Sequence, residues 1–208
     1  VKVHNANAKK MECFEKAAEL MSRLLLNDPE RILKSYPFEL SGGMCQRVAI
    51  AASMINSPKL LLGDEPTSAL DVTSQEEVVN QLKYLKNNFK VSAVIISHNI
   101  GAISMLSDDM AVMYGGKILE YGKTENVLYN PSHPYTKALI EAMPDMDGRI
   151  SGGLTGSPPV FTKEMKGCPF AGRCTEAEAR CFEDEPSDVY IAPEHRAKCF
   201  HLQSGGTC

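Results

Sequence analysis

The chain has 208 residues, of which 43% are hydrophobic, and its formal net charge at pH 7 is −4. This length is compatible with one full domain and a smaller unit, and the hydrophobic content suffices for a packed core. The mild acidity argues against a protein that binds nucleic-acid phosphates, and 7% aromatic residues without tryptophan argue against a platform for stacked bases. No apolar run approaches the roughly 18 residues of a membrane-spanning helix.

The first half of the sequence predicts helices that alternate with short strands. Apolar residues at helical spacing predict helices over residues 9–26, 42–56, 74–88 and 100–106. Short apolar runs over residues 59–63 and 91–97 predict buried parallel strands. This order is typical of an α/β domain, in which ligands bind at the carboxyl ends of the strands.

The second half predicts smaller elements. A Gly-Gly pair between two short runs, residues 110–114 and 117–121, predicts a β-hairpin, and short helices are expected over residues 124–129 and 135–143. Gly, Ser and Pro in residues 144–167 predict a linker, and the Cys-rich tail that follows has too little apolar mass to fold alone. We therefore expect three parts, residues 1–129, 130–167 and 168–208.

The segment Leu-Ser-Gly-Gly-Met-Cys-Gln-Arg at residues 40–47 predicts an anion site. Ser41 is typical of a helix N-cap, and Gly42 and Gly43 allow backbone N–H groups to approach a phosphate at the positive end of the helix dipole. Taken alone, the same residues are more often a simple helix cap with a flexible turn.

Two adjacent carboxylates follow the first predicted strand, at Asp64 and Glu65. Asp64 is suited to Mg²⁺, which prefers carboxylate and phosphate oxygens, and Glu65 could orient or deprotonate an attacking water. An acidic surface turn would explain the pair as well. Asp71 lies shortly after it, and His98 ends the second predicted strand.

The order and spacing of these four motifs closely resemble the nucleotide-binding subunits of ABC transporters. Residues 40–47 resemble the ABC signature, residues 60–65 the Walker B strand, residues 68–71 the D-loop, and His98 the switch histidine. Tyr-Pro-Phe-Glu-Leu at 36–40 and Asn-Pro-Ser-His-Pro-Tyr-Thr at 130–136 are similar to the peptide branch, which imports oligopeptides, dipeptides, or in some members nickel. Asn99 stands where aspartate is common, and Gly63 where alanine is usual.

The resemblance implies the fold of a partial P-loop NTPase core with part of a helical subdomain. It also implies the role of each site residue. Ser41, Gly42 and Gly43 would bind the γ-phosphate of an ATP held by a partner subunit, with Gln46 nearby. Asp64 would hold Mg²⁺. Glu65 would be the general base, His98 would sense the γ-phosphate, and Asp71 would act across the dimer interface.

A phosphate-binding Gly-x-x-x-x-Gly-Lys-[Ser/Thr] loop is not found in the sequence. We therefore expect that this chain alone does not hydrolyse ATP, although it could offer its signature to a partner. The parent subunit is expected to be an ATPase on the cytoplasmic face of the plasma membrane. Its expected partners are a second ATPase subunit, two permease subunits and, indirectly, an extracytoplasmic solute-binding protein, with no nucleic acid. Alternatives are a non-catalytic interaction module and a soluble DNA-repair ABC ATPase, against which the acidity and the segment at 130–136 argue.

Four cysteines of the tail predict a metal site. Cys168, Cys174, Cys181 and Cys199 are spaced too widely for the tight pairs of a zinc ribbon, but their spacing suits an iron–sulfur cluster. The peptide branch has a similar tail, which suggests a [4Fe–4S] cluster. Zinc, with a histidine such as His195 or His201 as a substitute ligand, is the alternative, and unligated thiols are a third.

Overall fold

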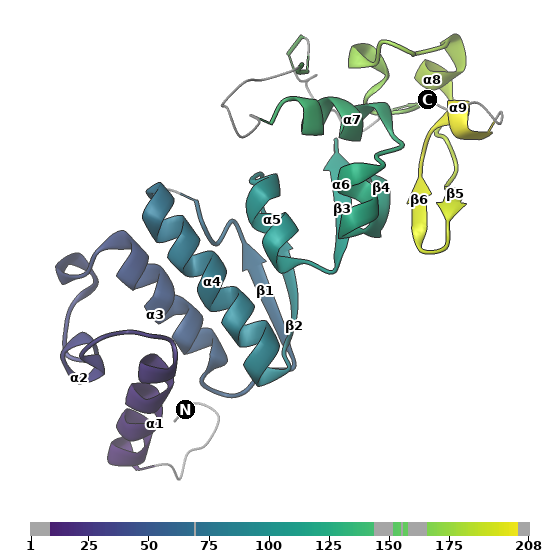
Figure 1. Ribbon diagram of the computed structural model, residues 1–208. Coiled ribbons are helices and arrows are strands. Elements are labelled where there is room, and N and C mark those ends of the chain that lie inside the picture. The colour runs from purple at the N-terminus through teal and green to yellow at the C-terminus, as the bar shows by residue number, and fades with distance from the viewer. Residues whose placement is uncertain (1–8, 69, 144–151, 155, 158–165, 204–208) are drawn as a thin grey trace. The chain divides into compact units, whose positions relative to one another are not determined.

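The computed structural model of the protein describes residues 9–68, 70–143, 152–154, 156–157 and 166–203. It divides into two units, Val1–Leu106 and Ser107–Cys208 (Figure 1). Among the described residues, every helix is too short or too polar to span a bilayer.

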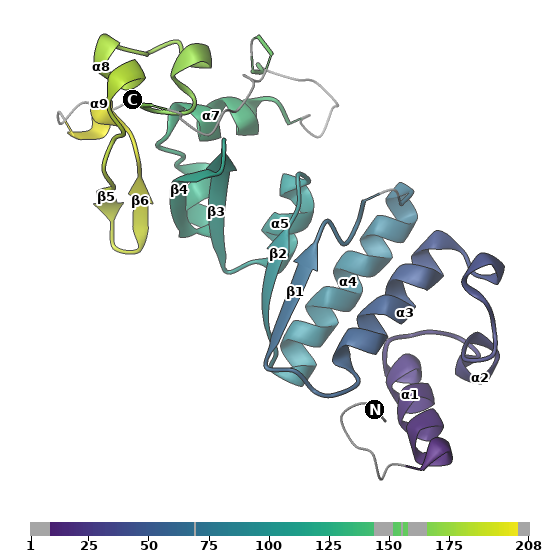
Figure 2. The same cartoon turned by 180° about the vertical axis from the view of Figure 1, so that it is seen from behind.

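The first unit is built from helices packed beside a small parallel sheet. Its helices are α1 (Lys10–Arg23), α2 (Pro29–Ile32), η1 (Pro37–Glu39), α3 (Gly42–Met54), α4 (Val72–Phe89) and α5 (Ile100–Leu106), and its strands are β1 (Leu60–Asp64) and β2 (Ser92–Ile96). Figures 1 and 2 show α3 and α4 side by side, with β1 and β2 beside α4. Leu24, Met54, Leu61, Val78 and Leu85 form the centre of the core between these elements. The predicted helices and the parallel pairing of the strands are confirmed.

The sequence predicts that the two strands are buried on both faces, but one face of each strand is exposed. Leu61 faces the core, whereas the side chains on the opposite face are exposed, namely Leu60 at 51%, Leu62 at 71%, Val94 at 53% and Ile96 at 56%. These four alternate with the core-facing residues because successive side chains of a strand point to opposite faces. Among the described residues of this unit, helices therefore cover only one face of the sheet.

The second unit is a four-stranded antiparallel sheet with short helices. Its elements are β3 (Asp109–Tyr114), β4 (Lys117–Lys123), α6 (Thr124–Tyr129), α7 (Pro134–Glu141), η2 (Ala171–Arg173), α8 (Ala179–Glu183), β5 (Val189–Ala192), β6 (His195–Ala197) and α9 (Phe200–Gln203). The strand order is β3-β4-β6-β5. The hairpin at Gly115 and Gly116 is confirmed, and both glycines have positive φ angles, 58° and 78°, as a tight turn between twisted strands requires.

The tail joins this sheet through a buried carboxylate that the sequence reading did not single out. Glu120 of β4 is 1% exposed, and its oxygens accept hydrogen bonds from the backbone N–H groups of Ser132 at 2.8 Å and His133 at 2.9 Å. One of these oxygens also lies 2.8 Å from Nε2 of His195 in β6. Strand β4 is thereby connected to the turn before α7 and to the tail. The predicted boundaries at 129 and 167 stay predictions, and most of the predicted linker lies outside the described residues.

Candidate functional site

The N-terminus of α3 has the features that the predicted anion site needs. Ser41 caps the helix, because its Oγ accepts a hydrogen bond from the backbone N–H of Met44 at 3.2 Å. Ser41 and Gly42 are exposed, whereas Gly43 is buried against α4. A Cβ at Gly43 would lie 3.0 Å from Oγ of Ser74, so glycine lets the two helices approach closely. The positive end of α3 is therefore held by α4 with its first residues open to a ligand.

Asp71 lies in the same region and caps α4. Its carboxylate accepts hydrogen bonds from the backbone N–H of Ser74 at 2.9 Å and from Oγ of Ser74 at 2.8 Å. These bonds, the backbone one foremost, lower the pKa of the Asp71 carboxyl. Asp71 is thus an ionised helix cap, which explains why α4 begins at Val72 rather than at Ser74 as predicted. Gln46 lies half-buried on α3.

The ends of β1 and β2 bring the predicted acid–histidine group together. Asp64 pairs in register with Ile96, and it is exposed. Glu65 follows it with a positive φ of 48°, and its backbone N–H donates to the carbonyl of Ile96 at 2.8 Å. This left-handed turn directs the Glu65 side chain toward His98 across the strand ends.

One carboxylate oxygen of Glu65 contacts His98, and the other has no hydrogen-bond partner among the described residues. Oε1 of Glu65 accepts a hydrogen bond from the His98 backbone N–H at 3.1 Å and lies 2.9 Å from its ring Nδ1. Oε2 is buried, and it has no hydrogen-bond partner among the described residues. An unpaired buried carboxylate oxygen is costly unless a ligand or water completes it. The Glu65 side chain as a whole is 33% exposed, so the arrangement fits a carboxylate that accepts a proton from a bound water, beside an exposed carboxylate suited to Mg²⁺.

Comparisons with known proteins find two families in the sequence. Residues 2–68 match the ABC transporter family, and residues 119–181 match the family described as oligopeptide/dipeptide transporter, C-terminal region. The oligopeptide transport ATP-binding protein OppD of Salmonella typhimurium is 39% identical over 92% of this chain and 57% of its own length. The dipeptide transport ATP-binding protein DppD of Lactococcus lactis is 38% identical over 96% of this chain and 58% of its own length. Over most of its length the chain is thus a homologue of the ATP-binding proteins of ABC transporters.

The fold of the chain also matches a solved structure. A metal-chelate type ABC transporter in an inward-facing conformation superposes with a TM-score of 0.55 at 25% identity, over 64% of this chain and 50% of that one. The α/β fold predicted from the resemblance is therefore confirmed. The chain spans less than two thirds of the length of the two curated relatives named above.

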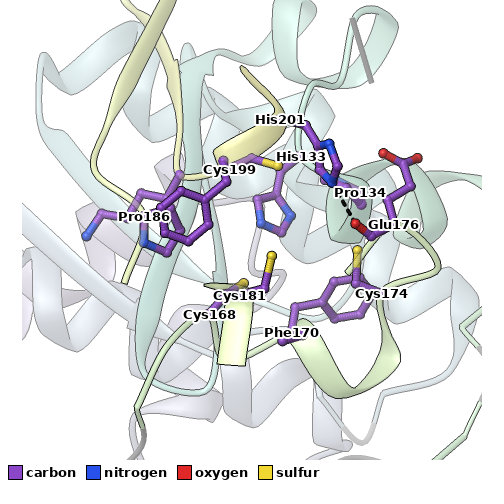
Figure 3. A pocket seen from close by; sticks show the side chains of 13 residues that line it. His133, Pro134, Cys168, Phe170, Cys174, Glu176, Cys181, Pro186, Cys199 and His201 are labelled. Atoms are coloured by element: carbon purple, nitrogen blue, oxygen red, sulfur yellow. Dashed lines mark hydrogen bonds between the residues drawn. The ribbon is translucent and has the colours of Figure 1, made fainter. Parts of the chain in front are cut away.

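The predicted metal site of the tail is wrong. The four cysteines do line one pocket, together with His133 and Phe170 (Figure 3). Among the described residues, however, no group of three or more His, Cys, Asp or Glu side chains is placed to hold a metal ion. This finding overturns the iron–sulfur cluster and gives no support to zinc.

The side chains around the pocket are engaged in other contacts. Burial raises the pKa of Cys168 and raises that of Cys174 to about 11, so both are neutral thiols at neutral pH in the packing described here. The two histidines proposed as substitute ligands make other contacts. His195 pairs with Glu120 at 2.8 Å, and Nε2 of His201 lies 2.6 Å from the backbone oxygen of Glu176. The thiols pack instead as small apolar groups.

Sequence reasoning missed one polar residue near the site, Gln75 of α4. Its Nε2 donates to the backbone carbonyl of Leu70 at 3.0 Å, and its Oε1 accepts from Nδ2 of Asn99 at 3.5 Å. A glutamine in the first turns of a helix that follows a cap is the only sequence signal for it, and that signal is weak because glutamine is an ordinary helix residue.

Proposed function

We propose that the chain supplies the signature helix and the hydrolytic carboxylate of an ATP-hydrolysing subunit of an ABC importer for oligopeptides or dipeptides. The exposed N-terminus of α3 carries the proposal, because Ser41 and Gly42 are open to solvent while Gly43 fixes the helix against α4. The solute class follows from the names of the two relatives and from the family matched at residues 119–181.

The residues of the site would act as follows. Ser41, Gly42 and Gly43, with Gln46 nearby, would bind the γ-phosphate of an ATP held by a second subunit, through N–H groups at the positive end of α3. Asp71, already ionised, would face that subunit.

The strand ends would form the other half of a site. Bound Mg²⁺ would supply charge that neutralises the phosphate oxygens, and Asp64 would hold it. Glu65, whose side chain is 33% exposed, would accept the proton of the attacking water. His98 would keep Oε1 in place and contact the γ-phosphate, for which its exposed ring is accessible.

The parent subunit would work as one of a pair, bound to two permease subunits on the cytoplasmic face of the membrane and served by a solute-binding protein. The closing of two subunits over ATP and their reopening after hydrolysis would drive the permease between inward-facing and outward-facing states. Since the sequence has no recognisable phosphate loop of its own, we propose that this chain completes an ATP site only in trans.

Complementation of a signature-defective partner tests the proposal. A full-length ATP-binding protein of the family, with its signature serine replaced by arginine, is mixed with this chain, and phosphate release from MgATP is measured. The chain should raise turnover by about a hundredfold or more, on the order of what one oxyanion-type donor contributes. The S41R variant should not, because its bulky side chain would block the phosphate at the α3 N-terminus.

The matched control is Glu65→Gln in this chain. It should restore turnover as well as the wild type, because the restored site uses the carboxylate of the full-length partner. Equal restoration by the S41R variant, or turnover by the chain alone, would contradict the proposal.

A further inference from the structure

Gln75 connects two segments of the site that are far apart in the sequence. Its amide nitrogen donates to the carbonyl of Leu70, just before α4, and its amide oxygen accepts from the side chain of Asn99, just before α5. Gln75 is half-buried, so both bonds lie partly shielded from water. One side chain therefore contacts both the D-loop segment and the segment that carries His98.

The Leu70 end of this connection lies beside the signature helix. The Leu70 side chain would be 3.5 Å from a Cβ placed on Gly42, and the next turn of α4 packs Ser74 against Gly43. A shift of the Leu70 backbone would therefore move the surface on which the first residues of α3 rest.

Asn99 makes two further hydrogen bonds, one through its side chain and one through its backbone. Its Oδ1 accepts from the backbone N–H of Ala102 at 3.1 Å and caps α5, and its own N–H donates to Oγ of Ser97 at 3.1 Å. The residue between, His98, holds Glu65 through its backbone N–H and its ring. Any displacement of Asn99 is thus transmitted directly to the group that orients the hydrolytic carboxylate.

We propose that Gln75 is a positioning residue, whose amide keeps the His98 segment in register with the D-loop segment beside the signature helix. The catalytic role of this positioning rests on the proposed function, whereas the hydrogen bonds of Gln75 do not depend on it. A glutamine suits this place because it offers a donor to the Leu70 carbonyl and an acceptor to the Asn99 amide. Glutamate lacks the donor, and leucine lacks both groups.

Amide hydrogen exchange of the chain without nucleotide, followed by NMR, tests the inference. Gln75→Leu should speed exchange at the His98 and Ala102 amides about fivefold, as expected for the loss of one net hydrogen bond. The His98 ring resonances should also shift, because the contact of Nδ1 with Glu65 loosens. Gln75→Glu should keep the Asn99 end and therefore stay closer to the wild type at Ala102.

Gln81→Leu is a matched control. Gln81 lies on the same helix, and it likewise donates to a backbone carbonyl, that of Leu24, at 3.1 Å. Its loss should change exchange near Leu24 and leave His98 unchanged. Equal effects of the two variants on His98 would show a general loosening of α4 and would overturn the inference.

A double-mutant cycle with Asn99→Asp completes the test. Aspartate keeps the oxygen that caps Ala102 but loses the donor to Gln75. If Gln75 acts through Asn99, the double variant exchanges at His98 no faster than the faster single variant; independent, multiplying effects overturn the inference. Because no nucleotide is present, failure here leaves the proposed function untouched, and failure of the complementation assay leaves this test valid.

Discussion

Replacing Glu120 by alanine is expected to unfold the sheet of the second unit far below its normal melting temperature. The Glu120 carboxylate is the acceptor for three buried donors, the backbone N–H groups of Ser132 and His133 and the ring of His195. Each buried donor left without a partner costs about 1–3 kcal/mol.

We take about 4 kcal/mol as the cost, because the donors lie close together and their losses are not additive. For a unit of about 100 residues, 1 kcal/mol lowers the melting temperature by about 4–8 °C. The expected fall is therefore about 15–30 °C. Differential scanning calorimetry measures it, and hydrogen exchange of peptides from β4 and β6 assigns the transition to this sheet.

Glu185→Ala serves as the control in the same unit. Glu185 is an exposed carboxylate that binds Lys117 at 2.6 Å and Lys198 at 3.0 Å. Surface ion pairs contribute about 0–1 kcal/mol, so this variant should lose only a few degrees. If both variants lower the melting temperature equally, the reasoning from buried donors is refuted.

Three further predictions concern single groups. Acidification should destabilise the second unit between about pH 6.5 and about pH 4, because burial lowers the pKa of His133 to about 4, an effect that a backbone hydrogen bond to Lys198 only partly opposes. In this range the unfolded chain binds a proton that the folded one excludes, so the free energy of unfolding decreases by at most about 3 kcal/mol as the pH is lowered. His133→Gln should flatten the pH profile of the urea midpoint. An unchanged profile counts against the assignment to His133. Alkylation of Cys174 by iodoacetamide, followed by peptide mass spectrometry, should keep rising tenfold per pH unit toward pH 11, because burial raises its pKa to about 11, and a plateau near pH 9 would contradict this. Ser41→Ala should destabilise the start of α3 by about 1 kcal/mol and speed exchange of the Met44 amide, whereas Ser41→Asn should not, since asparagine caps a helix equally well.

An element could be predicted from the sequence where the contact that fixes it joins residues close together in the chain. Ser41 predicts the start of α3 because the cap and its acceptor lie three residues apart. Gly115 and Gly116 predict the hairpin because the turn needs positive φ angles. The sequence predicts the start of α4 at Ser74, two residues late, because the carboxylate of Asp71 caps the helix and lets it begin at Val72.

The strands of the tail could not be predicted because distant contacts hold them. Strand β6 has three residues, too few for a period of two to be read. It is positioned by pairing with β4 and by the contact of His195 with Glu120, which are 75 residues apart. The cysteine spacing is misleading for a related reason, since spacing records the order of residues but neither the positions of the four side chains in space nor the other contacts of the histidines.

The exposed face of β1 and β2 shows that the composition of a strand does not determine its burial. A continuous apolar run such as Leu60, Leu61 and Leu62 is typical of a strand covered on both faces. In the described part of the first unit only Leu61 is covered, while Leu60 and Leu62 are exposed. The apolar composition of a strand therefore does not show by itself that both of its faces are covered. The same strand ends at Asp64 and Glu65, whose charged groups need water or phosphate rather than apolar cover. Their position at the carboxyl end was predictable from topology, whereas the burial of Glu65 Oε2 depends on its left-handed backbone and on His98, 33 residues away.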